Sequence, residues 1–215
     1  MNIPLFKRMK KQAHRDIALL QDQVLGVVYS LDGSAVLHGG TAIWRCFRGN
    51  RFSEDLDFYS VPGSRFRELL SKEIGKSGLE LLKFRETENS VYSKISGGNA
   101  LVALELAKRR FRNAAVSEFE TADGNFIDVF TPGPNALLLE KLSAYRGRML
   151  VRDIYDVYHL SRFVEASRPF NKEVSGLLAG LPLPKDERNL KGLILSGAVP
   201  SFSQMADALK ARFSE

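Results

Sequence analysis

A short apolar strand that carries two acidic residues, and that follows a pair of glycines, most constrains how this chain can fold. The motif contains a candidate strand, two glycines, a short candidate helix and a second candidate strand, at 35–38, Gly39-Gly40, 41–47 and 56–59. Side chains of a strand alternate between its two faces, so Asp55 and Asp57 are expected on one face. Leu56 and Phe58 are then expected on the other face, where they can enter a core.

Two carboxylates this close repel each other and need a compensating cation. Mg²⁺ prefers one or two carboxylates together with substrate phosphates, so the motif indicates phosphoryl or nucleotidyl transfer. A third carboxylate from a neighbouring strand commonly completes such a site, and Glu105 is the candidate. It lies in an apolar stretch, 101–108, in which alternate residues are expected in a core. The alternative is an edge-strand glutamate paired with Lys94 or Lys108.

The glycine pair suits an approach to phosphate groups. Gly39 and Gly40 allow the backbone to come close to a phosphate, and the N-terminus of the helix that follows favours negative charge. The Thr41 hydroxyl adds a donor. The alternative interpretation is that Gly-Gly is only a turn.

A second cluster of charged residues lies in two predicted helices, 134–146 and 152–164. Lys141 sits in an apolar helical stretch, where a desolvated ammonium can point at a phosphate or extend along the surface towards water. Asp153 and Asp156 share a helical face and can cap the helix or pair with nearby arginines. Those arginines are Arg146, Arg148 and Arg152. The corner formed by Arg146, Gly147 and Arg148 is interpreted as flexible and able to contact a phosphate or nucleic acid.

Composition limits the class of protein. The 215 residues, 44% of them hydrophobic, fit one sizeable domain or one domain with a helical extension. The net charge of +6 favours polyanionic partners, although a basic surface without a partner explains it equally well. The single cysteine, Cys46, is predicted to pack rather than to react, and it cannot form an intrachain disulfide. Together with the absence of a signal-like N-terminus and of a membrane span, this predicts a cytoplasmic protein.

The remaining pattern predicts alternating helices and strands. Further helices are expected at 5–30, at 64–76 with Ser64 as N-cap, and at two places beyond residue 170; further strands are expected at 79–87, 91–95 and 126–130. The basic start of the first helix and the run Lys108-Arg109-Arg110 are compatible with an RNA ligand, as they are with plain solvation.

Four pieces of the chain, taken together, resemble the AbiEii/AbiGii toxin family of nucleotidyltransferase-like proteins, which belongs to the DNA polymerase β superfamily. The pieces are Gly39-Gly40-Thr41-Ala42, Arg51-Phe52-Ser53-Glu54-Asp55-Leu56-Asp57-Phe58, Glu140-Lys141-Leu142-Ser143-Ala144 and Arg152-Asp153-Ile154-Tyr155-Asp156. The resemblance implies an α+β fold: a nucleotidyltransferase-like mixed β-sheet with flanking helices and a helical C-terminal half. It divides the chain into a catalytic core at 1–132 and a helical region at 133–215 that completes the active-site cleft.

The resemblance also implies which residues act. The catalytic set is Asp55, Asp57, Glu105, Lys141 and Asp153, and the metal ligands are Asp55, Asp57 and Glu105. The nucleotide-binding set is Gly39, Gly40, Thr41, Ser53, Lys141 and Arg146.

The implied reaction transfers a nucleoside monophosphate from an NTP to an acceptor, with Mg²⁺ or Mn²⁺ as the cofactor. The most favoured acceptor is RNA, at a tRNA 3′ end, and the implied role is that of a toxin with a cognate antitoxin. The alternatives are a transferase of the same fold that modifies a small hydroxylated molecule or a protein hydroxyl, and a non-catalytic nucleotide-binding module.

Overall fold

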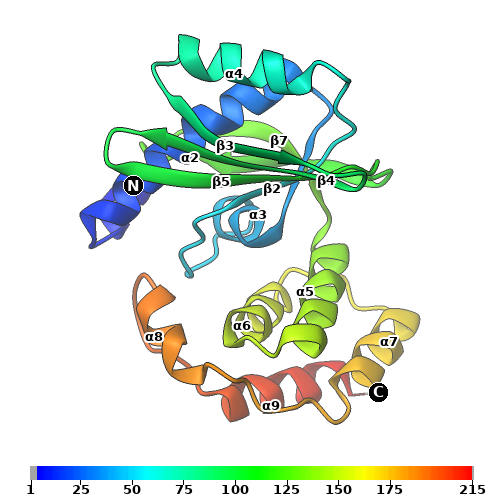
Figure 1. Ribbon diagram of the computed structural model, residues 1–215. Coiled ribbons are helices and arrows are strands. Elements are labelled where there is room, and N and C mark those ends of the chain that lie inside the picture. Colours follow the sequence, from blue (N-terminus) through cyan, green and yellow to red (C-terminus); the bar gives the residue numbers. More distant parts are fainter. Residues whose placement is uncertain (1–3, 215) are drawn as a thin grey trace. The chain divides into compact units, whose positions relative to one another are not determined.

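The computed structural model describes residues 4–214, and the chain forms two compact units (Figure 1). The first comprises Met1–Cys46 and Phe52–Pro132, of which the residues from 4 onward are described. The second comprises Phe47–Arg51 and Gly133–Glu215, described up to residue 214. Residues 47–51 therefore belong with the helical C-terminal half, although they lie between two strands of the first unit in the sequence. None of the helices within residues 4–214 has the length and apolar character needed to cross a membrane.

The first unit is built on one mixed sheet of seven strands in the order β3-β4-β5-β2-β1-β7-β6. The strands are β1 Val36–His38, β2 Leu56–Tyr59, β3 Glu80–Glu86, β4 Ser90–Gly97, β5 Ala100–Ala107, β6 Ala114–Glu120 and β7 Phe126–Pro132. At the centre, β2 runs antiparallel to β1 and parallel to β5, while β1 runs parallel to β7. The predicted α+β class with a mixed sheet is confirmed.

One face of the sheet forms the main core. Helices α2 (Gln12–Leu31) and α4 (Phe66–Lys76) cover this face, and α3 (Gly39–Cys46) lies on the other (Figure 1). The predicted alternation is confirmed, because Leu56 and Phe58 are fully buried while Asp57 between them keeps some exposure. On β5 the buried residues are Val102, Leu104 and Leu106. The acidic residues of both strands are consequently left on the face away from α2 and α4.

Three sequence predictions for this unit were wrong in detail. The helix expected at 5–30 is divided into α1 (Leu5–Arg8) and α2, because the chain is extended at Met9 and Lys11. Four lysines and arginines within residues 7–11 would otherwise lie against the positive end of a long helix dipole. Strand β6 was missed, since no regular alternation marks it. Ser64 is not the N-cap of α4, which begins after Arg65.

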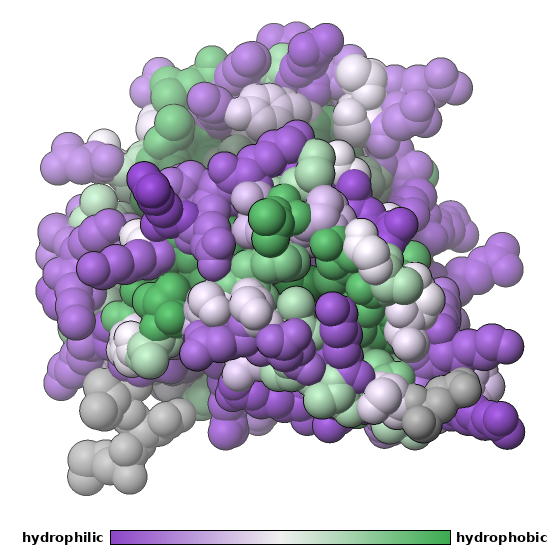
Figure 2. All heavy atoms as spheres, turned by 90° about the horizontal axis from the view of Figure 1, so that it is seen from below, coloured by the Kyte–Doolittle hydropathy of each residue, from purple (hydrophilic) through white to green (hydrophobic). Residues whose placement is uncertain are grey.

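The second unit is helical. Its elements are α5 Pro134–Arg148, α6 Val151–Leu160, α7 Arg168–Leu178, the 3-10 helix η1 Glu187–Asn189, α8 Leu190–Leu193 and α9 Phe202–Phe213. A proline at the first position of α5 and a Ser201–Gln204 capping box on α9 fix two of the helix starts. On the face of the molecule drawn in Figure 2, polar and charged side chains surround smaller apolar areas.

Candidate functional site

Two of the predicted catalytic carboxylates lie on neighbouring strands. Asp57 of β2 and Glu105 of β5 are register partners in the parallel pair, and His38 of β1 is opposite Asp57 in the antiparallel pair. Side chains of directly paired residues project from the same face of a sheet. Asp57 and Glu105 are therefore neighbours on the face away from the main core, as the sequence predicted.

Glu105 is exposed, and it forms no ion pair with either of the two lysines considered as alternative partners, Lys94 and Lys108. The Lys108 ammonium lies 2.6 Å from a Glu86 carboxylate oxygen. Lys94 is the register partner of Ala103, and no salt bridge recorded within residues 4–214 contains Glu105. A solvated carboxylate next to Asp57 is available to a ligand.

Asp55 lies directly before β2, and the chain there is anchored by Thr41. The Thr41 hydroxyl is fully buried and donates a hydrogen bond of 2.6 Å to the Asp55 carbonyl. The adjacent Ser53 carbonyl accepts a 3.0 Å hydrogen bond from the Gln21 amide. The geometry thus favours a positioning role for Thr41 over the phosphate contact predicted from the sequence, and the nucleotide-binding role of Ser53 stays a prediction.

We expect Thr41→Val to lower the rate of the nucleotidyl transfer that the sequence predicts about tenfold, which corresponds to about 1.4 kcal/mol, because Asp55 loses its anchor. Thr41→Ser keeps the hydroxyl and is the matched control. Transfer rates of the two variants, measured side by side, check this expectation. Equal rates for both variants would show that the hydroxyl does not position Asp55.

Gly39 is in close contact with Asp57. Its φ of +73° is one that L residues with a side chain rarely adopt, and a Cβ at this position would lie 2.2 Å from an Asp57 carboxylate oxygen. The sequence predicted that the two glycines form a turn before the helix. In the structure they are instead the first residues of α3. The first backbone N–H groups of a helix have no partner inside the helix. Gly39 therefore leaves room for the Asp57 carboxylate beside the start of α3.

We expect Gly39→Ala to lower transfer by about 10²-fold, since a displacement of about 1 Å at a reacting centre has an effect of that size. Gly98→Ala is the control, because Gly98 also has a positive φ, +56°, but no atom lies within 4 Å of the added Cβ. Both variants carry the backbone strain of about 1–2 kcal/mol, and only the first displaces Asp57. Unfolding and transfer measurements on both separate the two effects; equal transfer would contradict the proposed contact.

The acidic side chains of the site suit a metal ion whose remaining ligands come from the substrate. Within residues 4–214 no group of three His, Cys, Asp or Glu side chains is arranged to hold a metal ion. The metal-ligand roles of Asp55, Asp57 and Glu105 stay predictions. Mg²⁺ needs only one or two carboxylates when substrate phosphates supply further oxygens. The acidic pair on β2 and β5, Asp57 and Glu105, supplies one such carboxylate in Asp57, and Asp55 can supply the second.

In the helical unit, Lys141 lies within a buried chain of ion pairs. Its ammonium is 3.0 Å from Asp156 and 3.8 Å from Asp153, and both carboxylates are almost completely buried. Arg51 completes the chain with two hydrogen bonds to Asp156, of 2.8 Å and 2.7 Å. Burial alone would raise the pKa of Asp156, but Arg51 and Lys141 hold it below its ordinary value.

The other predicted residues of this unit have local partners. Asp153 accepts two hydrogen bonds from Arg148, of 2.6 Å and 2.7 Å, which is one of the predicted pairings. Arg146 donates to the Leu177 carbonyl at 2.8 Å and so binds the end of α7, which does not favour the phosphate contact predicted for it. Both arginines lie in the last turn of α5 rather than in a flexible corner.

The sequence prediction missed the role of Arg51. Its partner Asp156 is 105 residues away in the sequence, so no local spacing rule joins them. The only signal was that an arginine precedes Phe52-Ser53-Glu54-Asp55 and an aspartate ends the Arg-Asp-x-Tyr-Asp piece.

The fold is similar to that of known nucleotidyltransferase structures. MenT4, a nucleotidyltransferase toxin from Mycobacterium tuberculosis, aligns with a TM-score of 0.64 at 19% identity, over 92% of this chain and 82% of that one. JHP933 from Helicobacter pylori aligns with a TM-score of 0.62 at 18% identity, over 91% and 90%. At these identities the likeness supports the fold alone. No curated protein is significantly similar to this chain in sequence.

A family model identifies the chain more directly. The model described as "Nucleotidyl transferase AbiEii toxin, Type IV TA system" matches residues 27–179, which is more than half of the 215 residues. The matched range includes the glycine pair, the acidic strands and the ion-paired helices α5 and α6. This confirms the resemblance found in the sequence: the chain belongs to the AbiEii family of nucleotidyltransferase toxins and is a nucleotidyltransferase.

Proposed function

We propose that this nucleotidyltransferase moves a nucleoside monophosphate from an NTP to RNA, at a tRNA 3′ end, with Mg²⁺ as cofactor. The observation that supports this most is the register pairing of Asp57 with Glu105, beside a glycine that leaves room for the Asp57 carboxylate. Clustered carboxylates on a sheet face are costly unless a cation compensates them. A bound nucleotide with its metal would supply that compensation.

In the proposed reaction, an acceptor hydroxyl attacks the α-phosphorus of the NTP and pyrophosphate leaves. Mg²⁺, held by Asp55 and Asp57, would neutralise charge on the triphosphate. Glu105, the carboxylate next to Asp57, would accept the proton of the attacking hydroxyl. The hydroxyl oxygen would form a bond to the α-phosphorus, and the bond from that phosphorus to the oxygen of the leaving pyrophosphate would break. The first N–H groups of α3 would favour the negative charge of the phosphates.

For Lys141 and Asp153 we propose a structural contribution as the main role. Each is held in ion pairs within the helical unit, and Lys141 already contacts Asp156 at 3.0 Å. Their predicted catalytic role, and the nucleotide-binding role of Lys141, stay predictions. A Lys141→Met variant that keeps its fold but loses NTP affinity would support that role.

We propose RNA as the acceptor because the chain is basic and belongs to a family of toxins. The net charge is +6 and the pI is about 9.5, which favours a polyanion. A type IV toxin–antitoxin family suggests an antitoxin as a second partner. An RNA acceptor and a single cysteine are consistent with action in the cytoplasm.

The acceptor is tested by incubating the protein with Mg²⁺, total tRNA and each α-³²P-labelled NTP in turn. We expect label on tRNA with at least one NTP, and none with the Asp55→Ala/Asp57→Ala variant. Label on the protein itself would identify a protein hydroxyl as the acceptor. Label on a small hydroxylated molecule from a cell extract, with none on tRNA, would favour the small-molecule alternative. NTP binding without any transfer would favour a binding module.

A further inference from the structure

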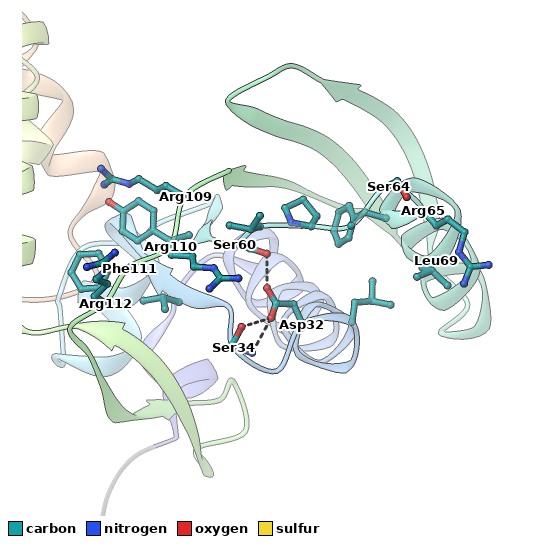
Figure 3. A pocket seen from close by; sticks show the side chains of 17 residues that line it. Asp32, Ser34, Ser60, Ser64, Arg65, Leu69, Arg109, Arg110, Phe111 and Arg112 are labelled. Atoms are coloured by element: carbon teal, nitrogen blue, oxygen red, sulfur yellow. Dashed lines mark hydrogen bonds between the residues drawn. The ribbon is translucent and has the colours of Figure 1, made fainter.

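A cavity at one end of the sheet in the first unit is rich in arginine. It has a volume of about 770 Å³. Its polar lining comprises Arg65, Arg109, Arg110 and Arg112, three serines, and one carboxylate, Asp32 (Figure 3). Four positive side chains against one negative side chain make the cavity attractive to an anion. Of the three serines, Ser34 and Ser60 donate their hydroxyl hydrogens to Asp32, and the Ser64 hydroxyl adds a further donor.

The single carboxylate is already occupied by its neighbours. One Asp32 oxygen accepts hydrogen bonds from the Ser34 amide at 2.9 Å and the Ser34 hydroxyl at 2.6 Å. The other accepts a 2.6 Å hydrogen bond from Ser60. Burial opposes ionisation, but these hydrogen bonds hold the pKa of Asp32 below its ordinary value. Asp32 therefore fixes one wall of the cavity, and Arg110 points into the space beside it (Figure 3).

Three of the four arginines, Arg109, Arg110 and Arg112, lie on a segment that is held in place at several points. Residues 108–113 carry the chain from β5 to β6, which lie on opposite sides of the β2-β1-β7 strands in the sheet. The ring of Phe111 stacks on Tyr59 with a centroid distance of 5.4 Å, and the Arg109 guanidinium lies 4.1 Å from the centre of the Tyr59 ring. Lys108 donates to the Thr87 carbonyl at 2.8 Å. Arg110 and Arg112 are thus presented by an ordered loop.

The cavity also adjoins the acidic site. Tyr59 lines the cavity and follows Asp57 by two residues on β2, so both side chains project from one face, about 7 Å apart along the strand. The Tyr59 ring also stacks on His38, the residue opposite Asp57, with a centroid distance of 3.7 Å. A small anion would occupy only one of these places, whereas a chain of phosphodiesters can follow both.

We propose that this cavity binds the phosphodiester backbone of the RNA acceptor, a few nucleotides from the end that is modified. Arg110 and Arg112 contact phosphates, and Phe111, supported by Tyr59, offers a ring on which a base can stack. The proposal rests on the proposed function, because it requires RNA as the acceptor. It gives a role to Arg110 of the Lys108-Arg109-Arg110 run, whose function the sequence alone left undecided.

The test compares two double variants that remove the same charge. Arg110→Ala/Arg112→Ala changes the cavity, and Lys72→Ala/Lys76→Ala removes two exposed lysines of α4 that do not line it. Binding of fluorescently labelled tRNA is measured by anisotropy over a range of KCl concentrations. We expect the cavity variant to bind roughly 10–30-fold more weakly, and the slope of log affinity against log salt to fall by about 1.4–1.8. The lysine variant should stay within about threefold of wild type.

The outcomes separate this proposal from the proposed function. If wild type binds tRNA and both double variants lose affinity equally, overall charge explains binding and the cavity proposal is wrong. If wild type does not bind tRNA at all, the RNA acceptor itself is wrong, and the cavity proposal with it. Thermal unfolding shows whether each variant is folded. Arg110→Gln and Arg112→Gln, tested singly, should each give about half of the slope change, and no change in either would also overturn the proposal.

Discussion

Replacement of Asp156 by alanine is expected to lower the free energy of unfolding by about 3–5 kcal/mol. Asp156 is 2% exposed and joins two cations, Arg51 and Lys141, in the helical unit. Without the carboxylate, the buried Arg51 guanidinium loses both of its hydrogen bonds to this residue. A buried charge left without compensation is far more costly than the net value of the pair itself. Urea unfolding monitored by circular dichroism measures the change.

Two controls test whether burial of the charge is the cause. Asp207→Ala removes an exposed aspartate from α9, and we expect a change within about 0.5 kcal/mol. The double variant Arg51→Met/Asp156→Leu removes both charges of the strongest pair, and it should be less destabilised than Asp156→Ala alone. A loss for Asp156→Ala no larger than that for Asp207→Ala would contradict the account.

The same carboxylate makes stability depend on pH. The pKa of Asp156 is held below its ordinary value of 3.8, so its contribution is fully present above that value. The contribution is lost as the pH falls below about 4, towards the lowered pKa of the folded state. Wild type should therefore lose stability over that range more steeply than Asp156→Ala. If the free energy of unfolding depends on pH in the same way in the two proteins, Asp156 does not contribute to the pH dependence of stability.

Asp57→Asn is expected to lower nucleotidyl transfer by roughly 10³-fold, the effect of removing one charge-stabilising group from an active site. Asparagine keeps the shape of the side chain but removes the negative charge that would hold a cation beside the triphosphate. The residue is part of β2, where Leu56 and Phe58 on either side anchor the strand in the core. The fold should therefore persist, which thermal unfolding can verify.

Glu54→Gln is the matched control for this loss. Glu54 is exposed and lies three residues before Asp57, outside β2, so its substitution removes one carboxylate from the same segment. We expect transfer within about twofold of wild type, since an exposed charge outside the site contributes little. If Asp57→Asn keeps more than a tenth of the wild-type rate, or if Glu54→Gln loses as much, the acidic pair is not the catalytic centre.

Local periodicity explains why much of the acidic site could be predicted from the sequence. Strand β2 has the predicted bounds, and its alternation is a property of four successive residues. The strand that carries Glu105 was also predicted from its buried alternate residues. The pairing of Asp57 with Glu105 depends on sheet register, which no local pattern specifies without the neighbouring strands.

The features that were missed depend on distant contacts or lack a regular pattern. The first five residues of strand β6 are partly or fully exposed and show no strict alternation, so the strand does not stand out from a loop. The helix at the N-terminus shows continuous apolar spacing, yet it breaks where Met9 becomes fully buried and its carbonyl accepts a hydrogen bond from Arg15. The apolar surroundings of Lys141 predicted burial, but not the two aspartates that compensate its charge.

Transfer of label from an α-³²P-labelled NTP to tRNA, by wild type and Asp57→Asn with and without EDTA, tests the central claim most directly. The account predicts labelled tRNA for folded wild type with Mg²⁺, loss of the label when EDTA removes the cation, and loss of roughly 10³-fold in the folded variant. Labelled tRNA that persists in EDTA, or that Asp57→Asn forms as fast as wild type, would contradict it.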